Sequence, residues 1–133
     1  RVLVADDNHD AADTLATHLR LQGHDVHVVY DGDEALAEAG RFAPEVVLLD
    51  LGMPKMDGCD AAREIRRQAQ DRPMVIVAVT GWGQPQDYRR TKLAGFDAHL
   101  VKPVDERSLT HLLATRFDAP EPGPGVQQGW RGA

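Results

Sequence analysis

Five short apolar runs alternate along the chain with segments of helical periodicity. The runs cover residues 2–5, 26–30, 46–49, 74–79 and 98–101. Short runs that are rich in β-branched residues and bounded by turn residues are typical of strands buried in a sheet. In the segments between them, apolar residues recur at intervals of three and four positions, which gives a helix one apolar face. The pattern therefore predicts that strand and helix alternate five times.

The apolar residues of the helical segments define the faces that are expected to pack on the sheet. These residues are Ala12, Leu15, Ala16 and Leu19 in the first helix, Ala35, Leu36, Ala39 and Phe42 in the second, Ala61, Ala62 and Ile65 in the third, and Leu109, Leu112, Leu113 and Phe117 in the last. The opposite side of the third helix is expected to face solvent and carries Arg63, Glu64, Arg66 and Arg67.

Start and stop signals bound several of these helices. Asn8 or Asp10 is expected to cap the first helix, and Gly23 to end it. Gly40 is expected to close the second helix, shortly before a proline. Asp105 is placed to cap the last helix, because its side chain can accept a hydrogen bond from a free backbone N–H of the first turn.

Regular alternation of strands and helices predicts an α/β fold, with a parallel sheet covered by helices on both faces. For five strands the common doubly wound, flavodoxin-like order is 2-1-3-4-5. The strand segments 26–30 and 98–101 are the most mixed in polarity, so we expect them at the edges. Residues 1–117 are predicted to form one domain, and the Pro/Gly-rich residues 118–133 a flexible tail.

Composition narrows the function classes. The 133 residues carry a formal net charge of −6, which disfavours nucleic-acid binding by this domain. Cys59 is the only cysteine, so an internal disulfide is excluded and a reducing, cytoplasmic location is favoured. No apolar run is long enough to span a membrane. Because the first residue is Arg1 and leads directly into a strand, we expect the chain to be either a domain excised from a larger protein or a processed form.

Polar side chains stand where the predicted strands end. Asp6 and Asp7 follow the first strand, Asp50 follows the third, Thr80 ends the fourth and Lys102 follows the fifth. In a parallel sheet all of these ends lie on one edge, where open α/β sheets bind their ligands. The sequence therefore predicts that three carboxylates, a hydroxyl and an ammonium group converge there.

The composition of this group indicates phosphoryl chemistry on a carboxylate. Three neighbouring carboxylates repel one another unless a cation compensates them. Oxygen ligands without histidine or cysteine suit a hard divalent ion, and Mg²⁺ is the expected one. A carboxylate beside Mg²⁺ can act as a nucleophile toward phosphorus, while Lys102 neutralises the transferring group and Thr80 donates a hydrogen bond to it.

With these residues in place, the chain resembles the receiver domain of two-component response regulators from residue 2 to about residue 117. The matching motifs are Asp6-Asp7, Asp50, Met53-Pro54, Asp57-Gly58, Thr80-Gly81, residues 94–98 and Lys102-Pro103. The resemblance implies that Asp50 accepts a phosphoryl group from a phosphohistidine on a histidine kinase or histidine phosphotransfer protein. It also implies an autocatalytic phosphoacceptor with slow self-dephosphorylation rather than a turnover enzyme, and leaves a weak homodimer open.

The family pattern also implies a role for each site residue. Asp7 binds Mg²⁺ directly and Asp6 binds it mainly through water, and Asp50 and the backbone carbonyl of Gly52 complete the protein ligands. Lys102 pairs with the phosphoryl group, and its peptide bond to Pro103 is expected to be cis. Thr80 moves toward the phosphoryl group and transmits the signal.

Three positions depart from the family pattern, and one of them, Gly52, offers no side chain to the phosphoryl site. His99 stands where members usually carry Tyr or Phe, and two interpretations remain open: an edge-strand histidine half in solvent, or a titratable switch residue. Trp82, two residues after Thr80, is bulky, and we hypothesise that it shields the acyl phosphate from water.

The segments 80–84 and 95–104 look most like receivers fused to hybrid sensor histidine kinases, so we favour that origin over a stand-alone receiver. A degenerate receiver that acts as a binding module without phosphorylation is the alternative function. A phosphohydrolase of the haloacid-dehalogenase type would want an acid at Gly52, and a flavin binder would not place Asp6 and Asp7 beside the phosphate.

Overall fold

The structure is a computed structural model that describes residues 1–53, 56–70, 72–81, 85–102 and 104–117. Trp82, Pro54, Pro103 and the tail at 118–133 lie outside the described residues, as do the predictions made for them. The elements are β1 (Val2–Ala5), α1 (His9–Leu21), β2 (Val26–Val29), α2 (Gly32–Phe42), β3 (Val46–Asp50), α3 (Gly58–Ala69), β4 (Val75–Thr80), α4 (Pro85–Leu93), β5 (Ala98–Val101) and α5 (Glu106–Phe117).

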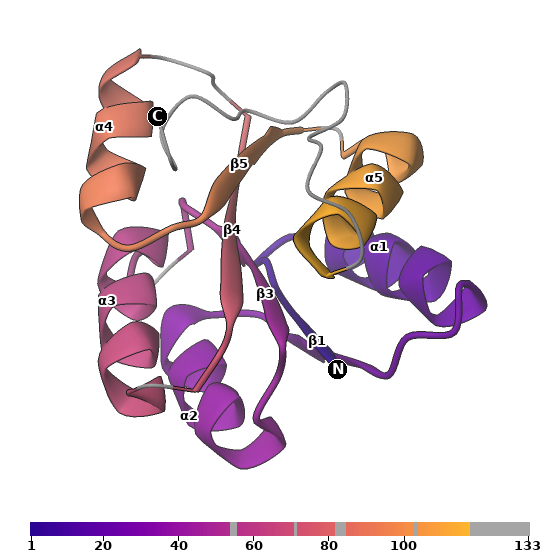
Figure 1. Ribbon diagram of the computed structural model, residues 1–133, viewed down its shortest axis with the longest axis horizontal. Helices are drawn as coiled ribbons and strands as arrows, with labels where there is room; N and C mark the ends of the chain where they lie inside the picture. Colours follow the sequence, from indigo (N-terminus) through magenta and orange to yellow (C-terminus); the bar gives the residue numbers. More distant parts are fainter. Residues whose placement is uncertain (54–55, 71, 82–84, 103, 118–133) are drawn as a thin grey trace.

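The strands form one parallel sheet in the order β2-β1-β3-β4-β5, which confirms the predicted doubly wound topology (Figure 1). The mixed strands β2 and β5 are its edges, as expected. Ala5 pairs with Leu49, Asp50 with Val79, and Thr80 with Val101. This register aligns the carboxyl ends of the strands, so the residues that follow them meet at one edge of the sheet.

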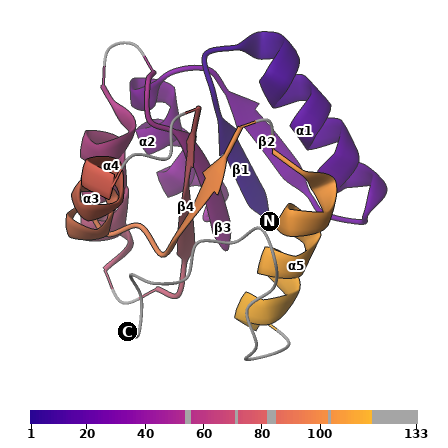
Figure 2. The same cartoon turned by 90° about the horizontal axis from the view of Figure 1, so that it is seen from above.

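Helices cover both faces of the sheet, α2, α3 and α4 on one side and α1 and α5 on the other (Figures 1 and 2). Each face has its own core cluster of buried residues, and alternate strand residues contribute to each. Leu49 and Ile76 point to the α2–α3 side, whereas Leu48 and Val77 point to the α1–α5 side. The alternation fixes which face each strand-end side chain can reach.

Side-chain caps start the helices where the sequence signals stand. Asn8 Oδ1 accepts a hydrogen bond from the Ala11 N–H at 3.1 Å, and Asp105 Oδ1 accepts one from the Arg107 N–H at 3.0 Å. Of the two candidates for the first cap, Asn8 is therefore the cap. No helix among the described residues is long and apolar enough to cross a membrane.

Gly40 does not end the second helix. The helix α2 continues to Phe42, and Ala43 ends it in the left-handed conformation with φ of 52°. A Cβ on Gly40 would meet only the flexible end of the Gln68 side chain of α3, with Nε2 at 2.5 Å, so this glycine is an interior residue of α2.

Arg66 does not face solvent as the third helix pattern predicted. Its guanidinium donates to the carbonyl oxygens of Met74 at 2.8 Å and Gly95 at 2.7 Å, and pairs with Asp97 Oδ2 at 2.8 Å. Asp97 Oδ2 also accepts the Ile76 N–H at 2.9 Å. The long side chain thus ties α3 to the starts of β4 and β5.

Candidate functional site

The three predicted carboxylates come together at the carboxyl edge of the sheet. Asp6 and Asp7 follow β1 and Asp50 is the last residue of β3, and each offers one oxygen such that the three oxygens lie within 4.8 Å of one another. Asp6 and Asp50 are buried, whereas Asp7 is exposed to solvent. The cluster is therefore open on the Asp7 side.

Lys102 supplies the ammonium group that the strand-end argument required. Its Nζ lies 3.1 Å from Asp6 Oδ2 and 3.4 Å from Asp50 Oδ2. The Lys102 backbone N–H donates to the carbonyl oxygen of Thr80 at 2.7 Å, so the residue that follows β5 is fixed to the end of β4. The lysine, which follows the edge strand β5, thus contacts the carboxylates at the ends of β1 and β3.

The second oxygen of each buried carboxylate is held by its own backbone. Asp6 Oδ1 accepts the N–H of Asn8 at 3.0 Å, and Asp50 Oδ1 accepts the N–H of Gly52 at 3.2 Å. Both are turns in which a carboxylate bonds to the backbone two residues on. They orient Oδ2 of both side chains toward Lys102.

Electrostatics at the site favours an added cation. Burial is the main cause that raises the pKa of Asp50 from 3.8 to about 6, and the charge of Asp6 raises it further. The hydrogen bond from the Gly52 N–H and the charge of Lys102 lower this pKa but do not outweigh burial. Partial burial lowers the pKa of Lys102, but Asp50 and Asp6 outweigh it, so the pKa of the lysine is raised above its ordinary value. Within the part of the chain that the structure describes, one ammonium group faces three carboxylates and does not compensate their charge.

The donor set fits a hard divalent cation. The three clustered side chains offer carboxylate oxygens only, which is the ligand chemistry of Mg²⁺, and that ion prefers a few carboxylates with water completing its shell. The exposed Asp7 is accessible for direct binding, whereas Asp6 already pairs with Lys102. Gly52 is exposed beside Asp50, within the turn that its N–H closes.

Thr80 and His99 share one face of the sheet. Ala78 pairs with His99 and belongs to the α2–α3 core cluster, and Thr80 follows it at the next position on that face. His99 is 0% exposed, so the prediction of a histidine half in solvent is wrong. The edge position of β5 leaves its hydrogen-bonding side open, but helices still cover both faces of the strand (Figure 2).

Support for the loop that follows Asp50 was not predicted from the sequence. Asp57 caps α3 by accepting the Asp60 N–H at 2.9 Å, and its other oxygen pairs with Arg90 of α4 at 2.9 Å. The Gly58 N–H donates to the carbonyl oxygen of Leu51 at 3.2 Å, which closes the loop at its base. The Asp57-Gly58 pair is the only part of this support that the sequence motif indicates. The pairing of Asp57 with Arg90 could not be predicted, because the two residues are distant in sequence.

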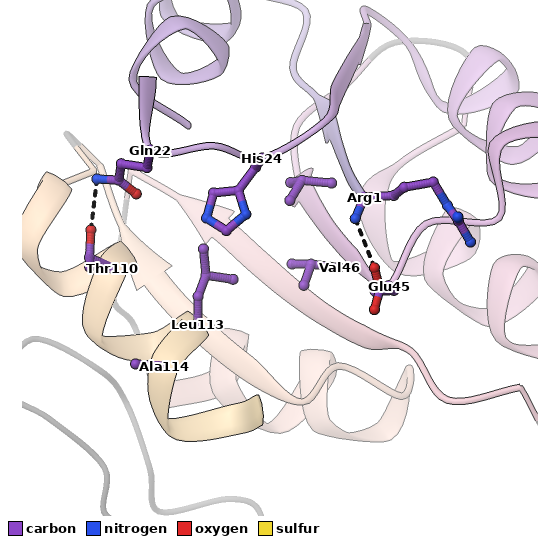
Figure 3. Close-up of a pocket in the computed structure, with 9 residues that line it drawn as sticks. Arg1, Gln22, His24, Glu45, Val46, Thr110, Leu113 and Ala114 are labelled. Carbon is purple, nitrogen blue, oxygen red and sulfur yellow. Dashed lines mark hydrogen bonds and ion pairs between the residues drawn. The ribbon is translucent and has the colours of Figure 1, made fainter. Parts of the chain in front are cut away.

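Two cavities lie between α1 and α5. One of about 610 Å³ runs from Asp6 and Lys102 along α1 over an apolar floor. The other, of about 480 Å³, lies at the opposite edge of the sheet, beside the starts of β1 and β3 (Figure 3). Among its described lining residues Glu45 is the one carboxylate, and it pairs with the Arg1 amino group (Figure 3).

Comparison with known proteins agrees with this geometry. The chain is 32% identical over 115 residues to the DNA-binding dual master transcriptional regulator RpaA of Synechocystis, covering 86% of this chain and 48% of that regulator. It thus spans about half the length of that relative. The chemotaxis protein CheY4 of Vibrio cholerae has a structure similar to it, with a TM-score of 0.79, 30% identity and coverage of 84% and 93% of the two chains.

The receiver domain of a sensor histidine kinase from Pseudomonas aeruginosa, solved with a magnesium ion in its active-site cleft, is similar too. Its TM-score is 0.77 at 32% identity, with 85% of this chain and 93% of that chain covered. The model of the response regulator receiver domain matches residues 2–114, which include every strand end described above. The chain therefore belongs to the response regulator receiver domain family of two-component signalling.

Proposed function

We propose that Asp50 accepts a phosphoryl group from a phosphohistidine on a histidine kinase or a histidine phosphotransfer protein. The observation that carries the proposal is the position of the Asp50 carboxylate, 3.4 Å from Lys102 Nζ and within 4.8 Å of the other two carboxylates. A nucleophile, a counter-charge for phosphate and oxygen ligands for a cation are thus combined in one place.

The transfer needs Asp50 in its ionised form. A carboxylate oxygen of Asp50 bonds to phosphorus as the bond from phosphorus to the imidazole nitrogen breaks, and that nitrogen keeps the electron pair. With a pKa of about 6 the carboxylate is largely ionised at neutral pH. The exposed Asp7 leaves the carboxylate cluster open to solvent, and a partner's histidine would approach from that side.

Lys102 and Thr80 have separate roles in this proposal. Lys102 leaves Asp50 for the phosphoryl oxygens, whose charge it neutralises, while its backbone stays bonded to Thr80. Thr80 turns its hydroxyl toward the phosphoryl group. His99, two strand positions from the end of β5 on the same sheet face, repacks in response, which is the switch inferred from the family.

Asp6, Asp7, Asp50 and the carbonyl oxygen of Gly52 would hold Mg²⁺. When bound, the ion compensates negative charge that builds up on the transferring phosphoryl group. Asp7 and the Gly52 carbonyl lie at exposed positions, and the cation would replace water there.

Acetyl phosphate with Mg²⁺ provides a direct test by intact mass. We expect one phosphoryl adduct on the wild-type protein and on Asp25→Asn, an exposed aspartate at the far edge of the sheet, and no adduct on Asp50→Asn. An adduct that persists in Asp50→Asn contradicts the proposal. No adduct on the wild-type protein favours the alternative, a degenerate receiver that binds partners without phosphorylation.

We also propose that this receiver is part of a hybrid sensor histidine kinase. The motifs at 80–84 and 95–104 support this origin. The complete coding sequence tests it. Kinase segments that precede the receiver are expected, whereas a DNA-binding segment after it would identify a separate regulator instead.

A further inference from the structure

Two glycines make unusually close backbone contacts around the segment that follows the phosphorylation site. A Cβ on Gly58 would lie 2.7 Å from the carbonyl oxygen of Asp50 and 2.8 Å from Cα of Leu51. A Cβ on Gly32 would lie 2.2 Å from the carbonyl oxygen of Met56 and 2.6 Å from Met56 Cβ. Cβ atoms essentially never approach within 3.0 Å of such atoms, so only glycine fits at either position.

The need for glycine at Gly32 comes from this contact and not from its own backbone. Among the described glycines only Gly23 and Gly95 have positive φ angles. Gly32 is the first residue of α2, where alanine would form the helix more readily. The helix start therefore gives no reason for glycine, whereas the close approach of Met56 does.

These contacts connect α2 to the phosphorylation site in two steps. Gly32 touches Met56, and Met56 is two residues before Gly58, which lies against the backbone of Asp50. The Gly58 N–H bond to Leu51 and the Asp57–Arg90 ion pair fix the segment on its other sides. A displacement of Met56 at the Gly32 contact is therefore expected to shift Gly58 and, through it, the backbone of Asp50.

We propose that Gly32 is a positioning residue for phosphoryl transfer, because it sets the place of Asp50 relative to Lys102 through Met56 and Gly58. The inference rests on the proposed role of Asp50 as the phosphoryl acceptor. Relief of the 2.2 Å contact to at least 3.0 Å requires a shift of nearly an ångström. Misplacement of a reacting group on that scale costs on the order of a hundredfold in rate.

Gly32→Ala and Gly40→Ala form a matched pair of variants. Both add a methyl group to α2, but the Cβ at Gly40 meets only the end of the Gln68 side chain, which can swing away. We expect Gly32→Ala to lower the phosphorylation rate at saturating acetyl phosphate and Mg²⁺ by at least tenfold. Half-saturating concentrations should stay within twofold, and Gly40→Ala should keep both constants within twofold.

A third variant separates positioning from loss of stability. Leu112→Ala makes a cavity in the α1–α5 core, far from Met56, and is expected to lower the melting temperature without a tenfold loss of rate. All rates are measured at a temperature where circular dichroism shows each variant folded. A tenfold rate loss in Leu112→Ala equal to that in Gly32→Ala would overturn the inference.

The outcomes distinguish this inference from the proposed function. If the wild-type protein takes no phosphoryl group, the proposed function fails first. If the wild-type protein is phosphorylated and Gly32→Ala matches it within twofold, only the positioning role is overturned. If Gly32→Ala does not fold, Met56→Ala is measured in its place. This variant truncates a half-buried side chain of the same segment, and we expect it to lower the phosphorylation rate by at least threefold. An unchanged rate in that variant overturns the inference.

Discussion

The ionised carboxylate of Asp50 is expected to destabilise the fold when no cation is bound. Its pKa is raised from 3.8 to about 6, so the folded protein binds the proton more tightly than the unfolded chain does. Between about pH 4 and pH 6 the folded state therefore carries more of this proton, and stability falls as the pH rises through that window. Above about pH 6 the ionised carboxylate lowers the free energy of unfolding by its full amount.

The magnitude follows from the size of the pKa shift. A shift of about two pKa units at 1.36 kcal/mol each corresponds to about 3 kcal/mol, which is an upper limit because solvent relaxation weakens it. Asp50→Asn removes the charge and keeps the shape and the acceptor for the Gly52 N–H. We expect this variant to be more stable than the wild-type protein by about 1–3 kcal/mol at pH 7.5 without Mg²⁺.

Urea unfolding between pH 4.5 and pH 8 in the presence of a chelator measures this difference. The advantage of Asp50→Asn should shrink steadily below pH 6, and the exposed control Asp25→Asn should show no such trend. Saturating Mg²⁺ should stabilise the wild-type protein by about 2–3 kcal/mol at a hundredfold excess over its dissociation constant, which offsets the advantage. A variant that is less stable than the wild-type protein at pH 7.5, or a difference independent of pH, would refute the reasoning.

Three further predictions concern the same residues and the support behind them. Protons and Mg²⁺ compete for Asp50, so calorimetric Mg²⁺ affinity should fall toward tenfold per pH unit below about pH 6. Lys102→Met should lower the acetyl phosphate rate by on the order of a hundredfold yet tighten Mg²⁺ binding, since it removes a competing cation. Asp97→Ala leaves Arg66 half-buried without its carboxylate and should cost about 2–4 kcal/mol in urea unfolding, against less than about 0.5 kcal/mol for Arg63→Ala on the exposed side of α3.

The strand-end residues of the site could be predicted because they depend only on strand order and direction. Once five strands run parallel, Asp6, Asp50, Thr80 and Lys102 must lie at the same edge, whatever the details of packing. Likewise, Asp105 could be identified as a helix cap, because a cap is a contact between near neighbours in sequence.

The sequence-based predictions that were wrong concern residues whose surroundings come from elements distant in sequence. Gly40 looked like a helix end, but α2 continues to Phe42, and the residue nearest to that position is Gln68 of α3. Arg66 looked solvent-exposed because no local pattern reveals Asp97 across the fold. His99 looked half-exposed because it lies on an edge strand of the sheet. Helices nevertheless cover both faces of that strand, so the side chain is buried.

The charge balance of the site explains why the lysine and the cation are both needed. Among the described residues, three carboxylates and one ammonium leave two negative charges in excess, which a divalent cation would cancel. If Asp50 accepts the phosphoryl group as proposed, its single charge is replaced by one close to −2. The site becomes negative again by about one charge, and this excess must be met by hydrogen-bond donors. Thr80, whose carbonyl oxygen accepts the Lys102 N–H, has its hydroxyl at that edge, so we propose that the charge added by phosphorylation draws Thr80 inward.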